Sequence, residues 1–575
     1  MRSEEVNKMD LIQSVSPLAG RLARPATLVN VQELVTAYFA LKPDPGIASQ
    51  RVVFGTSGHR GSAFTLAFNE AHILAITQAI CLYRRAVGID GPLFLAMDTH
   101  ALSEPAFVTA LEVLAANDVD TMIAARGEYT PTPVLSHAIL AYNLGRKTGL
   151  ADGIVLSPSH NPPDEGGIKY NMADGGPANV QATTHIEQIA NELLSENLKG
   201  VNRVSYARAL TSECVHAHDY VTPYILDLAN VVNLDAIRFE KVRLGIDPLG
   251  GATVHYWEDI IERYKIEATI VNGAVDPTFR FMHLDHDEKI RMDCSSPYAM
   301  AGLIAMRDKF DVAFGNDTDA DRHGIVCPAQ GLMNPNHFLS ASIAYLHANR
   351  PNWNSRSAVG KTVVSSSMID RLTAKLGRAL VEMPVGFKWF SGGLGNASLI
   401  FAGEESAGAS FLRRDGSVWT TDKDGLIMGL LAAEITAREG DDPQRYFEAA
   451  TKELGQSFYR RVDVAVSLAQ KQMIANIDTD EFDLHEVGGE PVRAKLTRAP
   501  GNDKPIGGIK VVTESGWFAV RPSGTEQIYK IYAESFRSEA HLNHIVADAH
   551  EIVSTVLLSD AKRPLTTTEP LHRSL

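Results

Sequence analysis

Three aspartates alternate within five residues of the chain, at Asp317, Asp319 and Asp321. Carboxylates at this spacing repel one another unless a cation lies among them. Ligand oxygens without nitrogen or sulfur favour a hard ion, Mg²⁺ or Ca²⁺. An EF-hand loop needs Gly at its sixth position and Glu at its twelfth, but Arg322 and Pro328 stand there. The motif therefore favours Mg²⁺, which commonly shares its ligands with phosphate; an exposed acidic turn is the alternative.

A serine on a stiff loop is the second chemical feature. Ser159 lies in the segment Ser-Pro-Ser-His-Asn-Pro, directly after the apolar run Gly153–Leu156. Proline restricts the residue before it to extended conformations, so Ser159 is expected on a stiff loop at a strand end. Such a serine is a candidate nucleophile or carrier of a transferred group. A serine hydrolase would need a G-x-S-x-G elbow and would leave the metal without a role, whereas phosphoryl transfer uses both.

Three further loops are rich in hydrogen-bonding groups. Phe54–Gly61 combines three glycines, two hydroxyls and an arginine, which suits an anion as well as an ordinary surface turn. Arg521–Glu526 offers an arginine, two hydroxyls and a glycine amide, suited to phosphate or to a plain hairpin turn. Gly403–Gly408 carries carboxylates and a hydroxyl, which suit sugar hydroxyls, and Lys423 could add a cation.

A repeated alternation of strands and helices is expected to position these loops. Apolar runs of strand length alternate with segments of helical periodicity over residues 93–156, 242–314 and 362–401. Each unit ends in a strand that runs into a polar loop. The pattern predicts an α/β fold of three similar βαβ domains with mixed, mostly parallel sheets, whose ligands bind beyond the strand ends. Short strands between glycine turns, then a helix near 542–557, predict a C-terminal α+β domain.

We therefore expect five segments arranged around a central cleft. In chain order they are an N-terminal helical arm (1–50), domain 1 with the serine loop (51–215), domain 2 with the metal loop (216–335), domain 3 with the sugar loop (336–445) and domain 4 with the phosphate loop (446–575). Within domain 2, the apolar spacing predicts a helix over Tyr298–Phe310.

Composition excludes several classes of partner. Lys and Arg number 54 and Asp and Glu 69, a net charge of −15, which disfavours nucleic acid and anionic membranes. The four cysteines are far apart and form no C-x-x-C, which suits a reducing compartment better than disulfides or zinc. No signal-peptide pattern or membrane-length apolar run occurs. We expect a cytoplasmic monomer or homodimer.

Taken together, the motifs resemble the α-D-phosphohexomutase superfamily, and within it the bacterial phosphoglucomutases. The S-H-N-P, D-x-D-x-D-R, G-E-E-S and R-P-S-G-T motifs occur in family order, from about Phe54 to the final helix. The resemblance implies reversible conversion of α-D-glucose 1-phosphate to α-D-glucose 6-phosphate through a phosphoserine enzyme. Glucose 1,6-bisphosphate would be both intermediate and activator. A catalytically idle relative that acts as a binding partner and a metal-dependent phosphatase are the alternatives.

The resemblance also implies a role for each loop. Ser159 carries the phosphoryl group and shares Mg²⁺ with Asp317, Asp319 and Asp321. His160, Lys169 and Arg60 match catalytic positions near the transferring phosphate. The hexose phosphate substrate is bound by the other matched residues, which are Thr56, Ser57, Arg322, Gly386, Glu404, Ser406, Lys423, Arg521, Ser523, Gly524 and Thr525.

Four residues at three sites depart from the commonest family pattern. His59 replaces an apolar residue, Ser157-Pro158 replaces Thr-Ala, and His100 stands where many relatives have Arg. These departures weaken assignment to the phosphomannomutase branch more than assignment to the superfamily. The Glu405-Ser406 pair favours glucose phosphates, while the strength of preference over mannose and glucosamine phosphates stays open.

Overall fold

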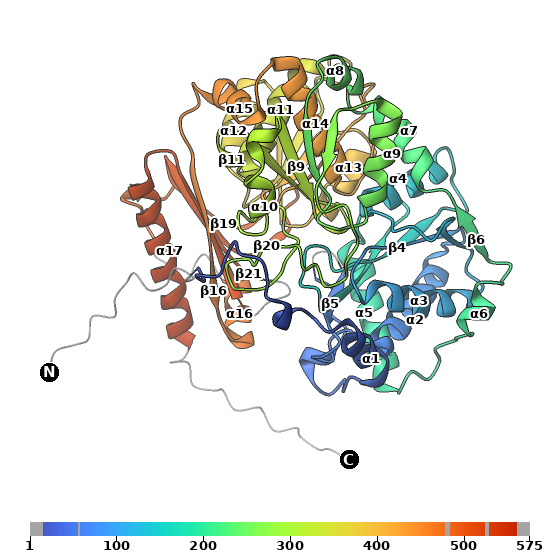
Figure 1. Cartoon of the computed structure of the whole chain (residues 1–575). Helices are drawn as coiled ribbons and strands as arrows, with labels where there is room; N and C mark the ends of the chain where they lie inside the picture. Colours follow the sequence, from blue (N-terminus) through green and yellow to red (C-terminus); the bar gives the residue numbers. More distant parts are fainter. Residues whose placement is uncertain (1–14, 56–57, 478–483, 524–527, 561–575) are drawn as a thin grey trace. The chain divides into compact units, whose positions relative to one another are not determined.

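Four β-sheets of four or more strands organise the part of the chain that the structure describes. The structure is a computed structural model and describes residues 15–55, 58–477, 484–523 and 528–560 (Figure 1). The chain divides into two units, Ser14–Leu454 and a second that contains Gly455–Leu575. Three sheets belong to the first unit and one to the second, and each unit is described by itself.

The first sheet and its helices span residues 59–218. Its strands are β1 (His59–Ser62), β2 (Leu93–Met97), β3 (Thr121–Ala124), β4 (Asp152–Leu156), β5 (Glu165–Asn171) and β6 (Val215–His218). Its helices are α2 (Glu70–Val87), α3 (Ser103–Ala116), α4 (Thr132–Asn143), α5 (Val180–Ser195) and α6 (Tyr206–Ala209). Buried apolar side chains of α2, α3 and α5 pack with those of the strands into one core.

The second and third sheets follow in chain order. Around the second lie α7 (Val221–Asp227), α8 (Leu234–Phe239), β7 (Leu244–Asp247), α9 (Val254–Tyr264), β8 (Ala268–Ile270), α10 (Ala301–Ile304), β9 (Val312–Asn316), β10 (His323–Cys327) and β11 (Gly331–Leu332). Around the third lie α11 (Pro335–Asn349), β12 (Ala358–Thr362), α12 (Met368–Lys375), β13 (Leu380–Met383), α13 (Ser391–Gly395), β14 (Leu399–Glu404), β15 (Gly408–Phe411), α14 (Gly425–Glu439) and α15 (Pro443–Thr451).

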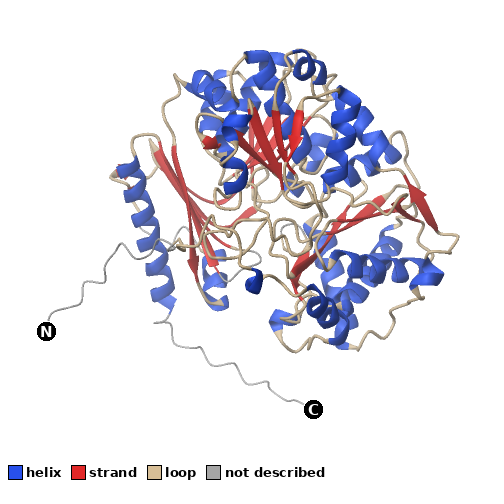
Figure 2. Ribbon diagram, viewed as in Figure 1, coloured by secondary structure: helices blue, strands red, loops and turns tan. Residues whose placement is uncertain are grey.

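These three sheets contain the same four-strand arrangement (Figure 2). The orders β5-β4-β2-β3, β10-β9-β7-β8 and β15-β14-β12-β13 correspond strand for strand. In each, three neighbouring strands are parallel and the fourth pairs antiparallel with the last of them. The expectation of three similar, mostly parallel βαβ sheets is therefore confirmed.

The repeat places three polar loops at one equivalent step. Residues 157–164 join β4 to β5, residues 317–322 join β9 to β10, and residues 405–407 join β14 to β15. Backbone hydrogen bonds hold the acidic and sugar loops near each other: His323 N, just after the acidic loop, donates to Ala407 O in the sugar loop at 3.0 Å, and Gly425 N of α14 donates to Ala320 O at 2.9 Å. The serine, acidic and sugar loops thus come from the same hairpin of successive repeats.

The second unit has a different architecture. Its sheet, in the order β16-β22-β21-β20-β19, is antiparallel throughout. Its elements are β16 (Phe458–Ala465), α16 (Leu468–Ala475), β17 (Glu486–Val487), β18 (Glu490–Pro491), β19 (Ala494–Arg498), β20 (Pro505–Val512), β21 (Gly516–Pro522), β22 (Ile528–Ser535) and α17 (Glu539–Asp560). Helix α17 packs along the sheet and contributes to a core with β20, β21 and β22 (Figure 1). The expected C-terminal α+β domain is confirmed.

Two expected helical segments are shorter in the structure. Among residues 15–50 one α-helix forms, α1 (Val31–Ala40), and Leu22 instead pairs with His283 in an isolated bridge. Residues 1–14 of the expected arm lie outside the described residues. The helix predicted over Tyr298–Phe310 is also wrong for most of its length, because only α10 and a 3₁₀ turn form there. Gly302 lies within α10, and because glycine disfavours a helix, its presence fits the short length of that element.

Candidate active site

The Ser159 loop has a strained backbone. Ser159 has a φ of 59°, in the left-handed region, which costs a residue with a Cβ roughly 1–2 kcal/mol. Its amide donates to Ser157 Oγ at 2.8 Å, and its carbonyl accepts from Thr318 Oγ1 at 2.6 Å. The buried Ser159 hydroxyl donates to Asp317 Oδ2 at 2.6 Å, whereas His160 Nδ1 lies 3.5 Å from the same Oγ. The nearer partner of the serine is thus a carboxylate, not the adjacent imidazole.

The three alternating aspartates form one buried cluster. One carboxylate oxygen from each lies within 4.8 Å of the others. Burial, reinforced by the charges of Asp321 and Asp319, raises the pKa of Asp317 well above its usual range. Asp319 Oδ1 and Asp321 Oδ1 are buried and accept no hydrogen bond from the part of the chain that the structure describes. Buried carboxylate oxygens without donors fit a hard cation.

Two lysines lie beside the acidic cluster. Lys169, on β5, forms ion pairs with Asp319 and, at 3.1 Å, with Asp321. Lys423 Nζ lies 3.2 Å from Asp321 Oδ2. Burial lowers the pKa of Lys169, but the charges of Asp319 and Asp321 outweigh burial and raise it overall. Both lysines line a small recess that also reaches Gly58, together with the carboxylates Asp321 and Asp422.

The other cations of the site approach from separate loops. Arg60 Nη1 donates to Asn161 Oδ1 at 3.2 Å, and Arg322 Nε lies 3.8 Å from Asp321 Oδ1. Burial, followed by the charge of Arg322, lowers the pKa of His160 well below its usual range, so the imidazole is neutral. The structure therefore brings Arg60, Lys169, His160 and Arg322 to the Ser159 loop or to the aspartates, as expected from the sequence.

The sugar loop is organised by a glycine. Gly386 N donates to Glu404 Oε1 at 3.0 Å, and Gly386 has a φ of 121°, which side chains rarely permit. Burial raises the pKa of Glu404, while the nearby Lys423 opposes the shift. Lys423 Nζ also lies 5.6 Å from the ring centroid of Phe387. Glu404, Gly386 and Lys423 therefore lie together, and the half-buried Ser406 follows in the same turn as Glu404.

The remaining expected site residues belong elsewhere or are not described. Arg521 and Ser523 lie at the end of β21 in the second unit. Arg521 Nε is buried and has no acceptor among the residues that the structure describes, which suits an external anion. Ser523 N donates to Ile528 O at 2.9 Å. Four expected site residues, Thr56, Ser57, Gly524 and Thr525, lie outside the described residues.

Some contributors carried no chemical signal in the sequence. The Thr132 side chain hydrogen-bonds Asp319 Oδ2, and its amide donates to Asp319 O at 2.9 Å, so it fixes this aspartate. Thr318 lies between two of the aspartates and binds the Ser159 carbonyl instead of the cluster. Asp293 interacts electrostatically with His160 and Arg322, which lower its pKa although burial raises it. Thr132 is the first residue of α4, and nothing in the sequence marked it for this contact.

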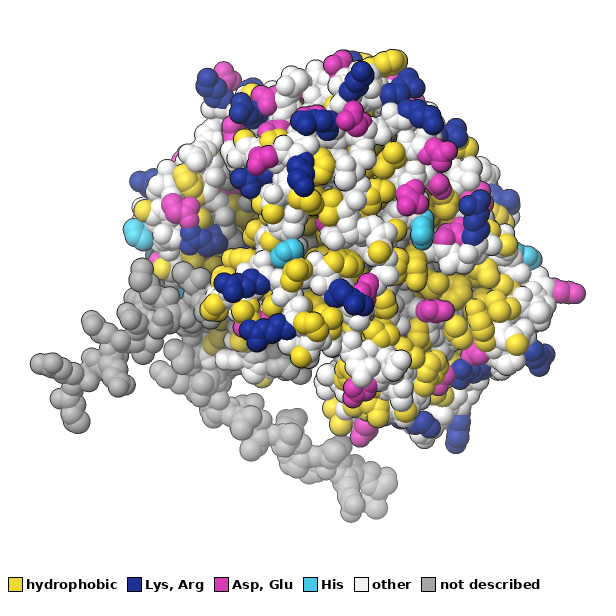
Figure 3. Space-filling view, in the orientation of Figure 1, with side chains coloured by type: hydrophobic (Ala, Val, Ile, Leu, Met, Phe, Trp, Pro, Cys, Tyr) yellow, Lys and Arg dark blue, Asp and Glu magenta, His cyan; other side chains and the backbone are white. Residues whose placement is uncertain are grey.

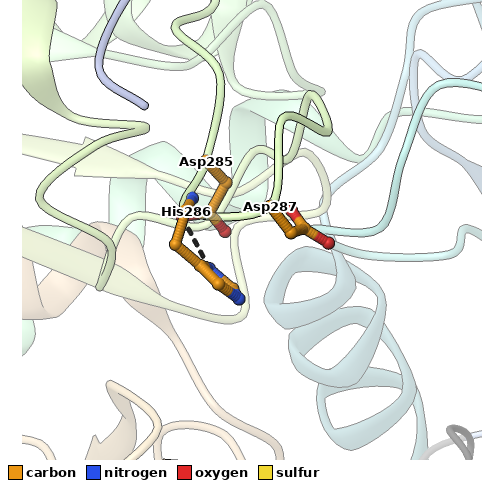
Figure 4. Close-up of side chains that lie close together, drawn as sticks. All are labelled: Asp285, His286 and Asp287. Carbon is orange, nitrogen blue, oxygen red and sulfur yellow. Dashed lines mark hydrogen bonds and ion pairs between the residues drawn. The ribbon is translucent and has the colours of Figure 1, made fainter. Parts of the chain in front are cut away.

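The structure contains a second group of potential metal ligands, formed by Asp285, His286 and Asp287 (Figure 4). Their ligand atoms lie close together, but nothing else about the group indicates a metal site. Arg291 neutralises it by donating to both oxygens of Asp287, at 2.6 and 2.9 Å. Asp285 Oδ1 accepts from Ser296 Oγ at 2.7 Å. Because these carboxylates already have donors, the cluster of Asp317, Asp319 and Asp321 is the better cation site.

Lys and Arg side chains are interspersed with Asp and Glu over the face in view (Figure 3). Among the described residues, no helix has both the length and the apolar character needed to cross a bilayer.

Sequence comparisons identify the same domains that the fold displays. Models of the phosphoglucomutase/phosphomannomutase family match residues 51–197 (α/β/α domain I), 222–331 (domain II), 334–454 (domain III) and 481–552 (C-terminal domain). A phosphoglucomutase from Komagataeibacter xylinus is 58% identical over 550 residues, which cover 96% of this chain and 99% of that protein.

Solved structures agree on the fold. The exocytosis-sensitive phosphoprotein parafusin, a phosphoglucomutase from Paramecium in its open form, superposes with a TM-score of 0.71 at 20% identity, covering 92% of this chain and 98% of its own. A phosphoglucomutase/phosphomannomutase family protein from Burkholderia thailandensis gives 0.65 at 19% identity, covering 89% and 98%.

Proposed function

The chain belongs to the phosphoglucomutase/phosphomannomutase family and interconverts α-D-glucose 1-phosphate and α-D-glucose 6-phosphate, and from this premise we propose that Ser159 carries the transferred phosphoryl group. The strongest support is the contact of Ser159 Oγ with Asp317 Oδ2 at 2.6 Å. That contact places a serine hydroxyl at the edge of a carboxylate cluster that fits a cation. Lys169 and Lys423 supply positive charge to the same cluster.

Two transfers account for the isomerisation. In the first, the 6-hydroxyl oxygen of glucose 1-phosphate bonds to the phosphorus of phospho-Ser159 and loses its proton, while the bond from that phosphorus to Ser159 Oγ breaks and Oγ takes up a proton to restore the hydroxyl. Glucose 1,6-bisphosphate results. In the second, Ser159 Oγ loses its proton and bonds to the 1-phosphate phosphorus, the bond to O1 breaks, O1 takes up a proton and glucose 6-phosphate leaves. The same second step lets added glucose 1,6-bisphosphate phosphorylate a resting enzyme, so it acts as an activator.

The acidic cluster is proposed to hold Mg²⁺. Asp317, Asp319, Asp321 and an oxygen of phosphorylated Ser159 would be its ligands. The fit rests on Asp319 Oδ1 and Asp321 Oδ1, the two buried oxygens without donors among the described residues. When bound, the ion neutralises charge on the moving phosphoryl group.

The remaining residues are proposed to bind the two ends of the substrate. Near the reacting phosphate, Lys169, Arg60, His160 and Arg322 would fix the phosphoryl oxygens. Glu404 and Ser406 would bind sugar hydroxyls, with Gly386 holding Glu404 in place and Lys423 adding a cation. Thr56 and Ser57, in the same loop as Arg60, would also bind the substrate. Arg521, Ser523, Gly524 and Thr525 would bind the phosphate that does not react.

Replacement of the serine tests this proposal. Ser159→Ala should abolish conversion of glucose 1-phosphate while leaving substrate binding, and Ser340→Ala is a matched control. Ser340 is also buried, and its hydroxyl donates to Asn336 O at 2.9 Å, within α11 and away from the site. Mutase activity is followed by coupled formation of glucose 6-phosphate, and phosphorylation of Ser159 by mass spectrometry. A normally active Ser159→Ala enzyme would refute the proposal, and net release of inorganic phosphate would identify a phosphatase instead.

Three further properties are proposed: the sugar preference, the cellular compartment and the oligomeric state. We expect glucose 1-phosphate to be converted faster than mannose or glucosamine 1-phosphate, which parallel assays on the three sugars can decide. The cytoplasm is the proposed compartment, since Cys81, Cys214, Cys294 and Cys327 are all free thiols in the structure. A monomer or homodimer is the proposed assembly, to be measured by light scattering.

A further inference from the structure

A buried carboxylate next to the Ser159 loop accepts hydrogen bonds from several segments of the chain. Asp98, at the end of β2, is fully buried. Its Oδ1 accepts from His100 N at 3.0 Å and from Ser103 Oγ at 2.5 Å. Its Oδ2 accepts from Ser157 Oγ at 2.7 Å and lies 2.9 Å from Thr318 Oγ1. Burial raises the pKa of Asp98, but the charge of His100 and then the hydrogen bonds of His100, Ser103 and Ser157 outweigh burial and lower it to about 2, so Asp98 is ionised.

Short chains of hydrogen bonds lead from this carboxylate to the strained serine. Ser157 Oγ donates to Asp98 and accepts the Ser159 amide at 2.8 Å. Thr318 Oγ1, from the acidic loop, lies within hydrogen-bonding distance of both Asp98 Oδ2 and the Ser159 carbonyl oxygen, and its single proton can serve one of these acceptors at a time, the nearer being the carbonyl. The peptide group before Ser159 is therefore tied to Asp98 through Ser157, and the peptide group after it is held by Thr318. A left-handed serine persists only where its surroundings hold it, and these contacts do so.

His100 ties the far side of the loop to the same carboxylate. Its Nδ1 lies 2.9 Å from Asp98 Oδ2 and its Nε2 lies 3.0 Å from the Asn161 carbonyl oxygen. Both of these oxygens are acceptors, so both ring nitrogens must carry protons. Neutral histidine would direct a lone pair at one oxygen. The charged groups around the ring are Asp98, Glu104 at the wall of an adjoining cavity, and Asp319 further away, all of which favour the cation.

We propose that Asp98 and the imidazolium of His100 form a buried ion pair that positions Ser159 for phosphoryl transfer, and that the positive charge of His100 is required for it. Neither side chain contacts the reacting atoms, so both are positioning residues. Asp98 fixes the loop before and at Ser159, and His100 fixes it at Asn161, whose side chain in turn accepts from Arg60. This inference rests on the proposed role of Ser159.

The structure offers a matched set of variants. His100→Phe keeps a ring but removes both hydrogen bonds and the charge. His100→Arg keeps a cation, and the cavity of about 410 Å³ that His100 lines gives the longer side chain room. His72→Phe is the control, because His72 is also buried in the first domain and also bonds through both nitrogens, to Asn69 N and Gln50 O at 3.0 Å.

The experiment measures kcat, KM and the protonation of His100. We expect His100→Phe to lower kcat by about 10- to 100-fold with an unchanged KM, since misplacing a reacting group by about 1 Å costs up to roughly 100-fold. His100→Arg should recover most of the wild-type kcat, and folded His72→Phe should keep it. In the wild-type enzyme, ¹⁵N NMR should show protons on both nitrogens of His100 at neutral pH.

Several results would overturn the inference. A wild-type kcat for His100→Phe, equal losses in His100→Phe and His72→Phe, or a His100→Arg enzyme no better than His100→Phe would each contradict it. If His100→Phe does not fold, the NMR spectrum decides, because a neutral His100 in the intact enzyme excludes the ion pair. An active Ser159→Ala enzyme would instead refute the proposed function, so the two failures are distinguishable.

Discussion

A methyl group added at Gly167 should displace the serine loop without touching any proposed substrate-binding side chain. Gly167 lies on β5, opposite Arg60 in the strand pairing, and its carbonyl accepts from Ser157 N at 2.9 Å. A Cβ there would lie 2.2 Å from Ser157 O and 2.7 Å from Pro158 Cα. The first separation is more than 1 Å short of ordinary contact at 3.4 Å, and backbone atoms cannot rotate away.

The expected magnitude of Gly167→Ala follows from that overlap. Overpacking of this kind costs about 1–3 kcal/mol of unfolding free energy. A shift of the Ser159 loop on the order of 1 Å lowers kcat by about 100-fold, or roughly 2.7 kcal/mol in the activation barrier. KM should stay near the wild-type value, because the atoms nearest to the added Cβ are backbone atoms of Ser157 and Pro158 and not proposed substrate-binding side chains.

The assay compares kcat, KM and thermal unfolding of Gly167→Ala with those of Gly392→Ala. Gly392, in α13, has no atom within 4 Å of an added Cβ, so its variant should keep normal activity. A folded Gly167→Ala enzyme with normal kcat would refute the reasoning that the loop backbone is held in one reactive position. Equal losses in both variants would refute it as well.

Three further predictions concern the cation site, the sugar loop and acid stability. Asp319→Asn should raise the Mg²⁺ concentration that the enzyme needs for half-maximal activity. It should also lower kcat by more than the roughly 10- to 100-fold that is typical when a residue behind a metal ligand is replaced. Undiminished activity of the unmutated enzyme in excess EDTA would contradict the role of the metal. Gly386→Ala should lose about 1–3 kcal/mol from its φ of 121° and raise KM, as measured by thermal melts and kinetics; an unchanged KM would separate Gly386 from the sugar site. The pKa of Asp98 is about 2 in the folded protein, below an unfolded value of about 3.9. The stabilisation that this difference provides, roughly 2.6 kcal/mol, is present above about pH 4 and is lost as pH falls towards 2. Urea unfolding of Asp98→Asn should lack this part of the acid dependence, and identical pH profiles for both proteins would contradict it.

The strands that end in polar loops could be predicted from the sequence, because their signal lies in neighbouring residues. Buried parallel strands such as β4 and β9 are short apolar runs, and turn-forming polar residues follow them directly. In each repeat, the candidate ligand-binding loop can therefore be located from the apolar run that precedes it. Of the antiparallel strands that complete the repeats, Gly324–Cys327 was evident as an apolar run, and Lys169 was expected on a short strand-like piece, but the full length of Glu165–Asn171 was less visible because it contains two glycines and a lysine.

The partners of the loops could not be predicted, because they depend on long-range packing. Thr132 meets Asp319 across 187 residues, and Thr318 meets Asp98 across 220. A threonine has no chemical signature that marks such a contact in advance. The predicted helix over Tyr298–Phe310 failed for a related reason: Met300 and Leu303 are spaced for burial, and tertiary packing buries them without a continuous helix.

Transfer of a labelled phosphoryl group from Ser159 tests the central claim most directly. The enzyme is phosphorylated with labelled glucose 1,6-bisphosphate, the label is located by peptide mapping, and unlabelled glucose 1-phosphate is then added in a rapid-quench experiment. The account predicts label on Ser159, and its appearance in sugar phosphate at a rate no slower than kcat. Label on another residue, or label that stays on Ser159 while glucose 6-phosphate forms, would contradict it.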